Sequence, residues 1–291
     1  MVVQDFTNEY HSAACALSTD DFREMIYHGD VLPGSRRVVV TEAPKRAFLG
    51  FGYLIAAESY AYREKVGENG QFEVQIVFKT DLSTEKGVEA AEMLLTELLR
   101  TCRELSEKDP AHPITARMWV DRREEAYGAF LEDFGFRETD RMWVMERALT
   151  EGAESEPITN LTAELENEAT MADYIAATEE GYGFPDSEEE MKYRLHYGNG
   201  RVYTLENKSY VTTWKISEGV AATENVFTRK AYRRQGYCTR TLNAVAAILA
   251  GEGMRKARLN VYEWNKEAIA LYEKCGYVHT RTLREMTLTT K

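Results

Sequence analysis

Apolar and polar positions alternate along several short segments of the chain, as they do in half-buried β-strands. This alternation marks residues 73–79, 114–120 and 141–149 in the first half, and residues 219–228 and 256–262 in the second. Other segments carry apolar residues at helical spacing, namely residues 86–105, 123–134, 236–250 and 266–275. Strands and helices follow one another in both halves, so each half is predicted to be an α/β domain.

The order of predicted elements in the first half is repeated in the second. In each half a strand leads into a long helix, followed by a strand, a short helix and final strands. The turns after the short helices also correspond, with DFGF at residues 133–136 and KCGY at residues 274–277, and a glycine so placed suits a helix C-terminus. We therefore interpret the chain as a duplicated unit.

The duplication suggests a domain boundary in the middle of the chain. Residues 150–156 (TEGAESE) are small and charged, with no apolar period, which is typical of a linker. This places one domain at residues 1–149 and the other at 157–291. Further helices are predicted ahead of each core, at residues 19–27, 170–180 and 187–196, with an irregular Gly- and Pro-containing loop at 180–186.

The segment YRRQGYCT at residues 232–239 lies between a strand ending near Thr228 and a long helix. A helix N-terminus presents unpaired N–H groups, which suit an anionic diphosphate. Arg233 and Arg234 add positive charge, and Gly236 permits close approach of the backbone. An ordinary helix start preceded by two exposed arginines would show the same short pattern.

A second pattern follows the strand at residues 256–262. It consists of Asn265, Ala268 and the pair Leu271-Tyr272, followed by Gly276 and an aromatic residue. Asparagine at a helix N-cap accepts a hydrogen bond from the first turn, and this alone would explain Asn265. A core aromatic residue with its hydroxyl at the edge would likewise explain Tyr272.

Together these two ordered patterns resemble the signatures of the GNAT superfamily of N-acetyltransferases. The first family pattern is Arg or Gln, two residues, Gly, one residue, then Gly or Ala, and Cys238 departs from it while remaining small. The resemblance implies two tandem GNAT-like α/β domains, each with a mixed, mostly antiparallel central sheet flanked by helices. It also implies acetyl-CoA as the co-substrate and no metal.

The resemblance assigns roles to particular residues. Tyr272 would donate a proton to the departing CoA thiolate. A primary amine of a small molecule or peptide would attack the thioester directly, and the resulting oxyanion would meet an N–H group near Val226 or Phe227. The expected cofactor-binding residues are Val226, Phe227, Thr228, Arg233, Arg234, Gln235, Gly236, Tyr237, Cys238, Thr239 and Asn265.

Direct attack requires a proton acceptor for the incoming amine. Glu224 is the candidate, because it lies on the strand just before residues 226–228, which the resemblance assigns to the pantetheine arm of the cofactor. The alternation of that strand could equally turn Glu224 to solvent. Cys238 is a weaker candidate for a nucleophile. A helix N-terminus would lower the pKa of its thiol, but packing explains a small residue there better.

The first half lacks the same chemistry. Residues 84–89 (TEKGVE) align with the diphosphate loop, where Thr84 replaces the basic residue and Glu89 the small one. Asp81 and Glu85 add negative charge nearby, which disfavours a diphosphate. Phe130 is placed at the tyrosine position and cannot donate a proton. We therefore expect residues 1–149 to be a degenerate copy.

The acceptor is expected at residues 179–190, where Tyr182 and Phe184 accompany several carboxylates. This mixture suits a cationic amine, although a solvated acidic loop with two anchoring aromatic residues would show the same composition. A different class of function, a non-catalytic acyl-CoA-binding or scaffolding protein, also fits two such domains.

Composition narrows the partners. The chain of 291 residues has 48 acidic and 36 basic residues, a formal net charge of -12 that disfavours nucleic acid. It contains no apolar run near the roughly 20 residues of a membrane helix and begins without a secretory pattern, so a cytoplasmic protein is expected. The four cysteines form neither a CxxC pair nor a metal-ligand cluster, which predicts reduced thiols. Nothing in the sequence predicts an oligomeric state.

Overall fold

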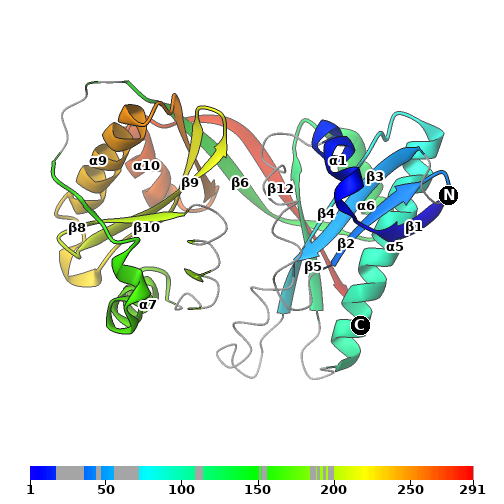
Figure 1. The fold of residues 1–291 in the computed structure, drawn as a ribbon, viewed down its shortest axis with the longest axis horizontal. Helices are drawn as coiled ribbons and strands as arrows, with labels where there is room; N and C mark the ends of the chain where they lie inside the picture. Colours follow the sequence, from blue (N-terminus) through cyan, green and yellow to red (C-terminus); the bar gives the residue numbers. More distant parts are fainter. Residues whose placement is uncertain are drawn as a thin grey trace. The chain divides into compact units, whose positions relative to one another are not determined.

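The computed structural model describes most of the chain as two compact units (Figure 1). Unit 1 comprises Met1–Asp140 and Leu283–Lys291, and unit 2 comprises Arg141–Thr282. The described residues are 1–17, 36–43, 47–55, 72–108, 114–150, 152, 156–183, 188, 191–192, 195 and 200–290.

Unit 1 is built on one sheet in which only β4 and β5 run parallel and every other recorded strand pairing is antiparallel. The strand order is β1 (Val2–Asp5), β2 (Arg36–Thr41), β3 (Phe48–Ile55), β4 (Phe72–Thr80), β5 (Ile114–Asp121) and β12 (Val278–Thr290). The helices are η1 (Asn8–Tyr10), α1 (His11–Leu17), α5 (Glu85–Lys108) and α6 (Glu125–Asp133).

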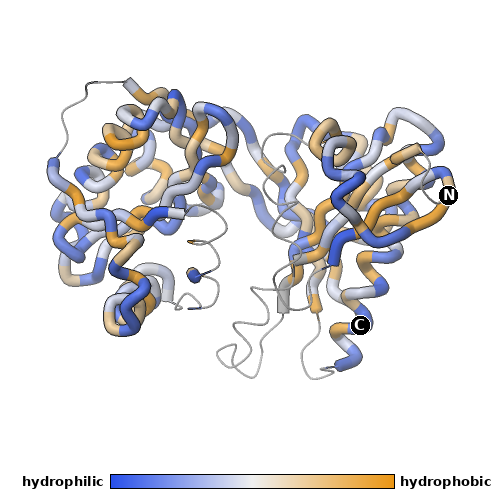
Figure 2. The backbone as a smooth tube through the Cα atoms, viewed as in Figure 1, coloured by the Kyte–Doolittle hydropathy of each residue, from blue (hydrophilic) through white to orange (hydrophobic). Residues whose placement is uncertain are grey.

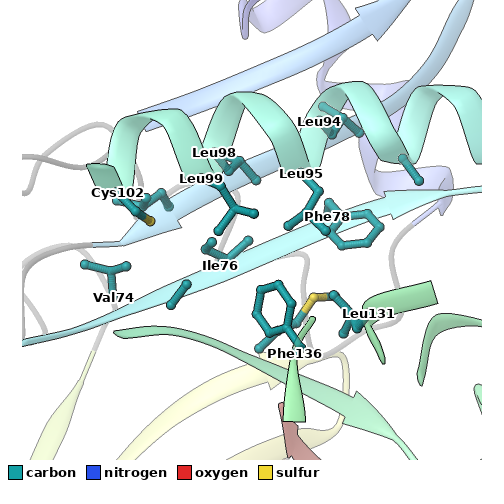
Figure 3. Close-up of a cluster of buried hydrophobic side chains, with 14 of the residues drawn as sticks. Val74, Ile76, Phe78, Leu94, Leu95, Leu98, Leu99, Cys102, Leu131 and Phe136 are labelled. Carbon is teal, nitrogen blue, oxygen red and sulfur yellow. The ribbon is translucent and has the colours of Figure 1, made fainter. Parts of the chain in front are cut away.

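The core of unit 1 lies between the sheet and α5. The apolar face of α5, with Leu94, Leu95 and Leu98, packs against Ile76 and Phe78 of β4 (Figure 3). Because successive strand residues point to opposite faces, a second cluster lies on the other side of the sheet beside α1, made by Tyr10, Ala14, Val39, Phe51, Tyr53 and Val77. The strands of this unit are accordingly largely hydrophobic, whereas α5 alternates between polar and apolar positions (Figure 2).

The strands of unit 2 are arranged in the same way. Its strand order is β6 (Arg137–Ala148), β11 (Lys256–Tyr262), β10 (Val220–Thr228), β9 (Ser209–Ser217), β8 (Arg201–Leu205) and β7 (Thr159–Asn160). Its helices are η2 (Glu164–Glu166), α7 (Glu168–Tyr182), η3 (Lys230–Tyr232), α9 (Tyr237–Gly251) and α10 (Lys266–Lys274). The mixed, mostly antiparallel sheet flanked by helices that the sequence predicts is confirmed.

The two faces of the unit 2 sheet are covered by different helices. Leu242 and Val245 of α9 and Tyr272 of α10 share one buried cluster with Leu259 of β11. A second cluster joins α7 to the strands through Tyr174, Tyr210 and Phe227. The side covered by α9 and α10 is called the α9 face, and the side covered by α7 is called the α7 face.

The compact units do not follow the predicted boundary at residues 150–156. Residues Leu283–Thr290 of β12 pair with β5 and belong to unit 1, whereas residues Met142–Ala148 of β6 pair with β11 and belong to unit 2. Each half of the sequence therefore supplies its last strand to the unit formed mainly by the other half. The division at 1–149 and 157–291 describes the repeated sequence, which is a different division from that of the compact units.

The helices and strands predicted from periodicity are present wherever the structure describes them, within a few residues at their ends. Gly135 and Gly276 have φ angles of 94° and 84°, the left-handed conformation expected of a glycine after a helix. Helix α1 and the strands β1, β2, β3, β7, β8 and β9 were not predicted from the sequence. The predicted helix at residues 19–27 lies outside the described residues, as does most of the one at 187–196.

Membrane-spanning helices and metal-binding clusters are the two other features considered for the described residues. None of the described helices combines the length and the apolar character required to cross a bilayer. Among the same residues, no three His, Cys, Asp or Glu side chains gather closely enough to hold a metal ion.

Candidate active site

The parallel strands β10 and β11 diverge within unit 2. They pair only from Val220 to Ala222 on β10 and from Lys256 to Arg258 on β11. Beyond these residues β10 continues to Thr228 and β11 to Tyr262 without pairing to each other. A bulge in β10 between Glu224 and Phe227, with Asn225 at a φ of 46°, accompanies the divergence.

The N-terminus of α9 lies in the sequence just after this divergence, and no side chain caps it. Gly236 is the N-cap residue with a φ of 82°, and no side chain hydrogen-bonds to the cap. Arg234 also has a positive φ, 62°, a conformation that costs a residue with a side chain about 1–2 kcal/mol. The first-turn N–H groups of Tyr237, Cys238 and Thr239 have no carbonyl partner within the helix. The loop therefore presents backbone donors and the positive end of a helix dipole.

The side chains of the loop point elsewhere. Arg233 donates from Nε to the Thr228 carbonyl at 3.1 Å and from Nη2 to the Glu180 carbonyl at 2.7 Å. Arg234 is exposed and forms an ion pair with Glu267 at 2.8 Å. Gln235 donates to the Ala231 carbonyl at 3.0 Å. Both guanidinium groups expected at the diphosphate are therefore engaged by other groups of the protein, and the backbone donors become the principal feature of the loop.

The first residues of α9 contact the interior of unit 2. The Tyr237 hydroxyl accepts a hydrogen bond from the Lys208 ammonium at 3.0 Å. Burial raises the pKa of the Cys238 thiol to about 12, and nearby Cys275 acts in the same direction. The lowering expected from the helix N-terminus is thus outweighed by desolvation, and Cys238 is a protonated packing residue at neutral pH.

Asn265 and Tyr272 occupy the two ends of α10. Asn265 Oδ1 accepts a hydrogen bond from the Ala268 N–H at 3.1 Å, which confirms its N-cap role. The Tyr272 ring is buried and lies edge-on to Tyr277 at 6.0 Å between centroids. Burial, assisted by nearby Cys238, raises the pKa of Tyr272 well above its ordinary value. Its phenol therefore stays protonated at neutral pH and can act as a proton donor.

The two tyrosines of this cluster differ in their hydrogen bonds. The Tyr277 hydroxyl lies 2.9 Å from Thr223 Oγ1, whereas the Tyr272 hydroxyl makes no hydrogen bond with any described residue. Only the second phenol is available for an added molecule, so the structure favours the catalytic interpretation of Tyr272 over simple packing.

Glu224 lies on the other side of the sheet. Thr223 points toward Tyr277 in the cluster of the α9 face, so its neighbour Glu224 projects toward the α7 face. Glu224 is partly buried, so the alternation of β10 does not turn it fully to solvent. A proton donor on one face and a carboxylate on the other thus flank the point where β10 and β11 diverge.

Unit 2 also has two partly or largely exposed aromatic side chains. The ring of Tyr182, which is 41% exposed, packs edge-on against Phe227 at 5.5 Å. Phe184, the other expected acceptor residue, lies outside the described residues. The sequence analysis missed Trp264, which is 64% exposed and stacks on Tyr262 at 5.3 Å at the carboxyl end of β11. A tryptophan directly before the cap Asn265 was the signal that could have revealed it.

The corresponding place in unit 1 is filled by the protein itself. Strands β4 and β5 also pair only at their beginnings, from Phe72 to Gln75. Past this point the Tyr127 hydroxyl accepts from the Thr80 N–H and donates to the Thr80 carbonyl, both at 2.7 Å. Buried Lys79 lies over the Tyr127 ring at 4.6 Å and pairs with Glu124 at 2.7 Å.

The helix start of unit 1 is capped as well. Thr84 Oγ1 accepts a hydrogen bond from the Gly87 N–H at 3.1 Å, so a first-turn donor of α5 is already used. Gly87 lies inside α5 rather than before it, and a Cβ there would meet the Asp81 carbonyl oxygen at 1.8 Å. Gly87, the glycine retained from the loop pattern, thus allows close packing inside α5. This helix begins two residues before its glycine, whereas α9 begins directly after Gly236.

One sequence alignment needs correction. α6 and α10 each span nine residues and are followed by Gly135 and Gly276, which places Leu131, not Phe130, opposite Tyr272. Leu131 is fully buried and, like Phe130, has no hydroxyl group. By the same alignment Tyr127 corresponds to Ala268. The placement of Phe130 was wrong by one residue because it was not anchored on the corresponding glycines, Gly135 and Gly276.

These features define the class of protein. A parallel strand pair that diverges before an uncapped helix N-terminus is the arrangement expected of the GNAT acetyltransferase fold. Residues 159–277 match the acetyltransferase (GNAT) family, so this segment is a GNAT-family domain.

Solved structures show the same fold over the whole chain. A GCN5-related N-acetyltransferase from Sphaerobacter thermophilus matches with a TM-score of 0.71 and 16% identity, over 99% of this chain and 95% of that one. A tandem GNAT protein from the clavulanic acid biosynthesis pathway matches with a TM-score of 0.62 and 11% identity, over 93% and 87% of the two chains. At these identities the likeness concerns the fold.

Sequence similarity to curated proteins is short. The chain is 36% identical over 53 residues to thialysine N-epsilon-acetyltransferase of Mus musculus. The match covers 18% of this chain and only 31% of that protein.

Proposed function

We propose that unit 2 is an acetyl-CoA-dependent N-acetyltransferase that acts on a primary amine of a small molecule or peptide by direct attack. The family supports acetyl transfer, and the observation that carries the finer proposal is the placement of an unengaged phenol and a carboxylate on opposite faces where β10 and β11 diverge. Activity in the cytoplasm, as the sequence suggests, is part of the same proposal.

The residues present fit acetyl-CoA. The uncapped amides after Gly236 suit its diphosphate, and the end of β10, residues 226–228, offers backbone groups for its pantetheine arm. The co-substrate supplies an activated acetyl thioester. The chain supplies first-turn backbone donors of α9 that no side chain caps, next to the left-handed residues Arg234 and Gly236.

Each proton transfer has a candidate side chain. Tyr272, protonated at neutral pH, donates to the departing thiolate from the α9 face. Glu224 accepts the proton of the acceptor ammonium from the α7 face, directly or through water. Because Tyr272 and Glu224 lie on opposite faces of the sheet, the two proton transfers use separate sides of the site.

A small cationic amine is the proposed acceptor. Glu224 and the partly exposed rings of Tyr182 and Trp264 are chemically suited to an ammonium group. The short match to an enzyme named for thialysine, an amine of this kind, is consistent with this choice. A peptide N-terminus carries the same charge and is the other acceptor to screen.

We further propose that unit 1 is a degenerate copy that binds no acyl-CoA. Tyr127 takes both backbone groups of Thr80 at the end of β4, and Thr84 caps α5, so the donors that unit 2 offers are already used. Titration of the intact chain with CoA should therefore give one site per chain. A stoichiometry of two would contradict this part of the proposal.

The alternative is a protein that binds acyl-CoA without catalysis. It would share the diphosphate site but would not require a free phenol near the thiol. The unengaged hydroxyl of Tyr272 favours the enzyme, and kinetics of one substitution separates the two functions.

Tyr272→Phe removes the proposed proton donor while keeping the ring. We expect the rate of thiol release at saturating acetyl-CoA to fall about 100-fold, the lower range for loss of a general acid, with the Kd for CoA changed less than about threefold. Thiol release with a panel of primary amines measures the rate, and calorimetry measures binding.

Tyr277→Phe is the matched control, because it removes a neighbouring buried hydroxyl that is bound to Thr223. It should lower stability and leave the rate near that of the wild type. Equal rates for Tyr272→Phe and the wild type would reject the general-acid role. Binding of CoA without turnover of any amine by the wild type would favour the non-catalytic alternative.

A further inference from the structure

The last turn of α7 is fastened to the end of β10 by packing. A Cβ on Gly181 would approach the Phe227 side chain to 2.8 Å, so the helix backbone lies directly on that ring. The neighbouring Tyr182 packs edge-on against the same ring. The helix ends at Gly183, whose N–H donates to the Glu179 carbonyl at 2.8 Å.

Two arginines next to this contact reach back to α7. Arg233 donates to the carbonyls of Glu180 at 2.7 Å and Gly181 at 3.3 Å while also bonding the Thr228 carbonyl. These carbonyls belong to the last turn of α7, where a helix leaves carbonyl groups without partners. The Arg233 guanidinium therefore acts as a C-terminal cap for α7.

The second arginine holds the same turn from the inside. Arg229 has a largely buried side chain that pairs with Asp173 at 2.6 Å and with Glu180 at 3.1 Å. The other oxygen of Glu180 accepts from the Lys230 N–H at 3.2 Å. The side-chain carboxylate and the backbone carbonyl of Glu180 are thus both bound to the segment between β10 and α9.

We propose that Arg233 is a positioning residue that clamps the C-terminal turn of α7 to the diphosphate loop and thereby sets the acceptor side of the site. In its observed position the guanidinium bridges three carbonyl groups and faces the protein rather than the anion site. The diphosphate loop and α7 are consequently linked by one side chain, that of Arg233. This inference rests on the proposed function only for its kinetic readout.

The test compares Arg233→Ala and Arg233→Lys with Arg234→Ala, which removes the same charge from an exposed position in the same loop. In the protein without ligand, both Arg233 variants should speed amide hydrogen exchange at residues 181–183 about tenfold, and Arg234→Ala should not. Lysine is not expected to rescue, because a single ammonium lacks the planar fork that bridges several carbonyls. The Kd for CoA should change less than about threefold in both Arg233 variants, because the Arg233 guanidinium binds carbonyl groups of the protein.

With an amine that the wild type acetylates, both Arg233 variants should raise the KM for the amine at least about fivefold and leave the KM for acetyl-CoA within about twofold. Unchanged exchange at residues 181–183 would overturn the proposal. So would a loss of CoA affinity that Arg233→Lys restores, because that result indicates a charge bound to the diphosphate. The exchange measurement stands even if no amine is acetylated, so failure of the proposed function is a separate result.

Discussion

Two tyrosines lie side by side in unit 2 with different chemical prospects. Tyr277 is tied to Thr223, and burial raises its pKa to about 12. Tyr272 has a raised pKa for the same reason but no hydrogen bond to the described residues. A raised pKa keeps a phenol protonated as the pH rises. Ionisation of Tyr272 should therefore cause no loss of activity at any pH below 10.0, the ordinary pKa of a tyrosine.

Glu224→Gln tests the proposed proton acceptor. We expect the turnover rate to fall about 100-fold near pH 7, where an amine acceptor is protonated and needs a base. The deficit should shrink toward about pH 10, because an increasing fraction of a lysine-like amine is then already neutral. A profile of turnover rate against pH for the variant and the wild type measures the deficit.

Glu263→Gln is the control for the loss of one negative charge in the same unit, and its profile should follow that of the wild type. A deficit in Glu224→Gln that stays constant across the pH range would assign Glu224 to binding or structure. No deficit at any pH would remove it from the site altogether.

At the scale of elements, the helix starts differ in how their donors are used. Asn167 caps α7 by accepting from the N–H groups of Ala169 and Thr170, and Asn265 caps α10. Thr84 does the same for α5. Only the start of α9 combines a glycine at the N-cap with no side-chain hydrogen bond among these four. The uncapped start of α9 is consistent with the proposal that its donors bind a ligand.

Substitutions at the two asparagine caps separate capping from cofactor binding. Asn265→Ala and Asn167→Ala should each cost about 1 kcal/mol of stability in denaturant unfolding, the usual loss for an N-cap. Asn265→Asp keeps the cap and should retain stability. It should nevertheless weaken CoA binding about tenfold, because it replaces an amide donor with a negative charge.

The cap of α7 serves as the reference for binding. Asn167→Ala should leave the affinity for CoA unchanged despite its loss of stability. If Asn265→Asp bound CoA as tightly as the wild type, Asn265 would be a helix cap and nothing more.

At the scale of the whole molecule, the ends of the two halves are exchanged. Met286 of β12 is fully buried in the core of unit 1, although it comes from the second half of the sequence. Met145 of β6 is fully buried in the core of unit 2, although it comes from the first half. Unit 1 is therefore formed by two separate stretches of sequence, whereas unit 2 is one continuous stretch that contains the boundary between the two halves.

This exchange predicts where each core substitution acts. Met286→Ala should lower stability by about 2–5 kcal/mol and speed amide exchange in β5, whereas Met145→Ala should have the corresponding effect in β11. Exchange measured by mass spectrometry on both variants makes each the control of the other. The reverse pattern, with β11 loosened by Met286→Ala, would show that the units follow the sequence halves.

Most of the fold could be predicted because helices and strands follow local periodicity. α5 and α9 were predicted from apolar spacing alone, and the glycine turns at Gly135 and Gly276 from their position after short helices. β2 and β3 escaped, although their residues alternate or are apolar, because no repeat of a known pattern drew attention to them. The predicted loop and helix signatures also placed the candidate site in unit 2, whose residues 159–277 match the family.

The sequence by itself determined the helices and strands with clear periodicity, their duplication, and the family's two signatures at residues 232–239 and 265–277. These depend on neighbours within a few positions along the chain. Only the tertiary structure decided that Arg233 binds the end of α7, that Tyr127 occupies the backbone of Thr80, and that β12 completes unit 1. Such contacts join residues far apart in sequence, and their geometry arises only when the chain is packed.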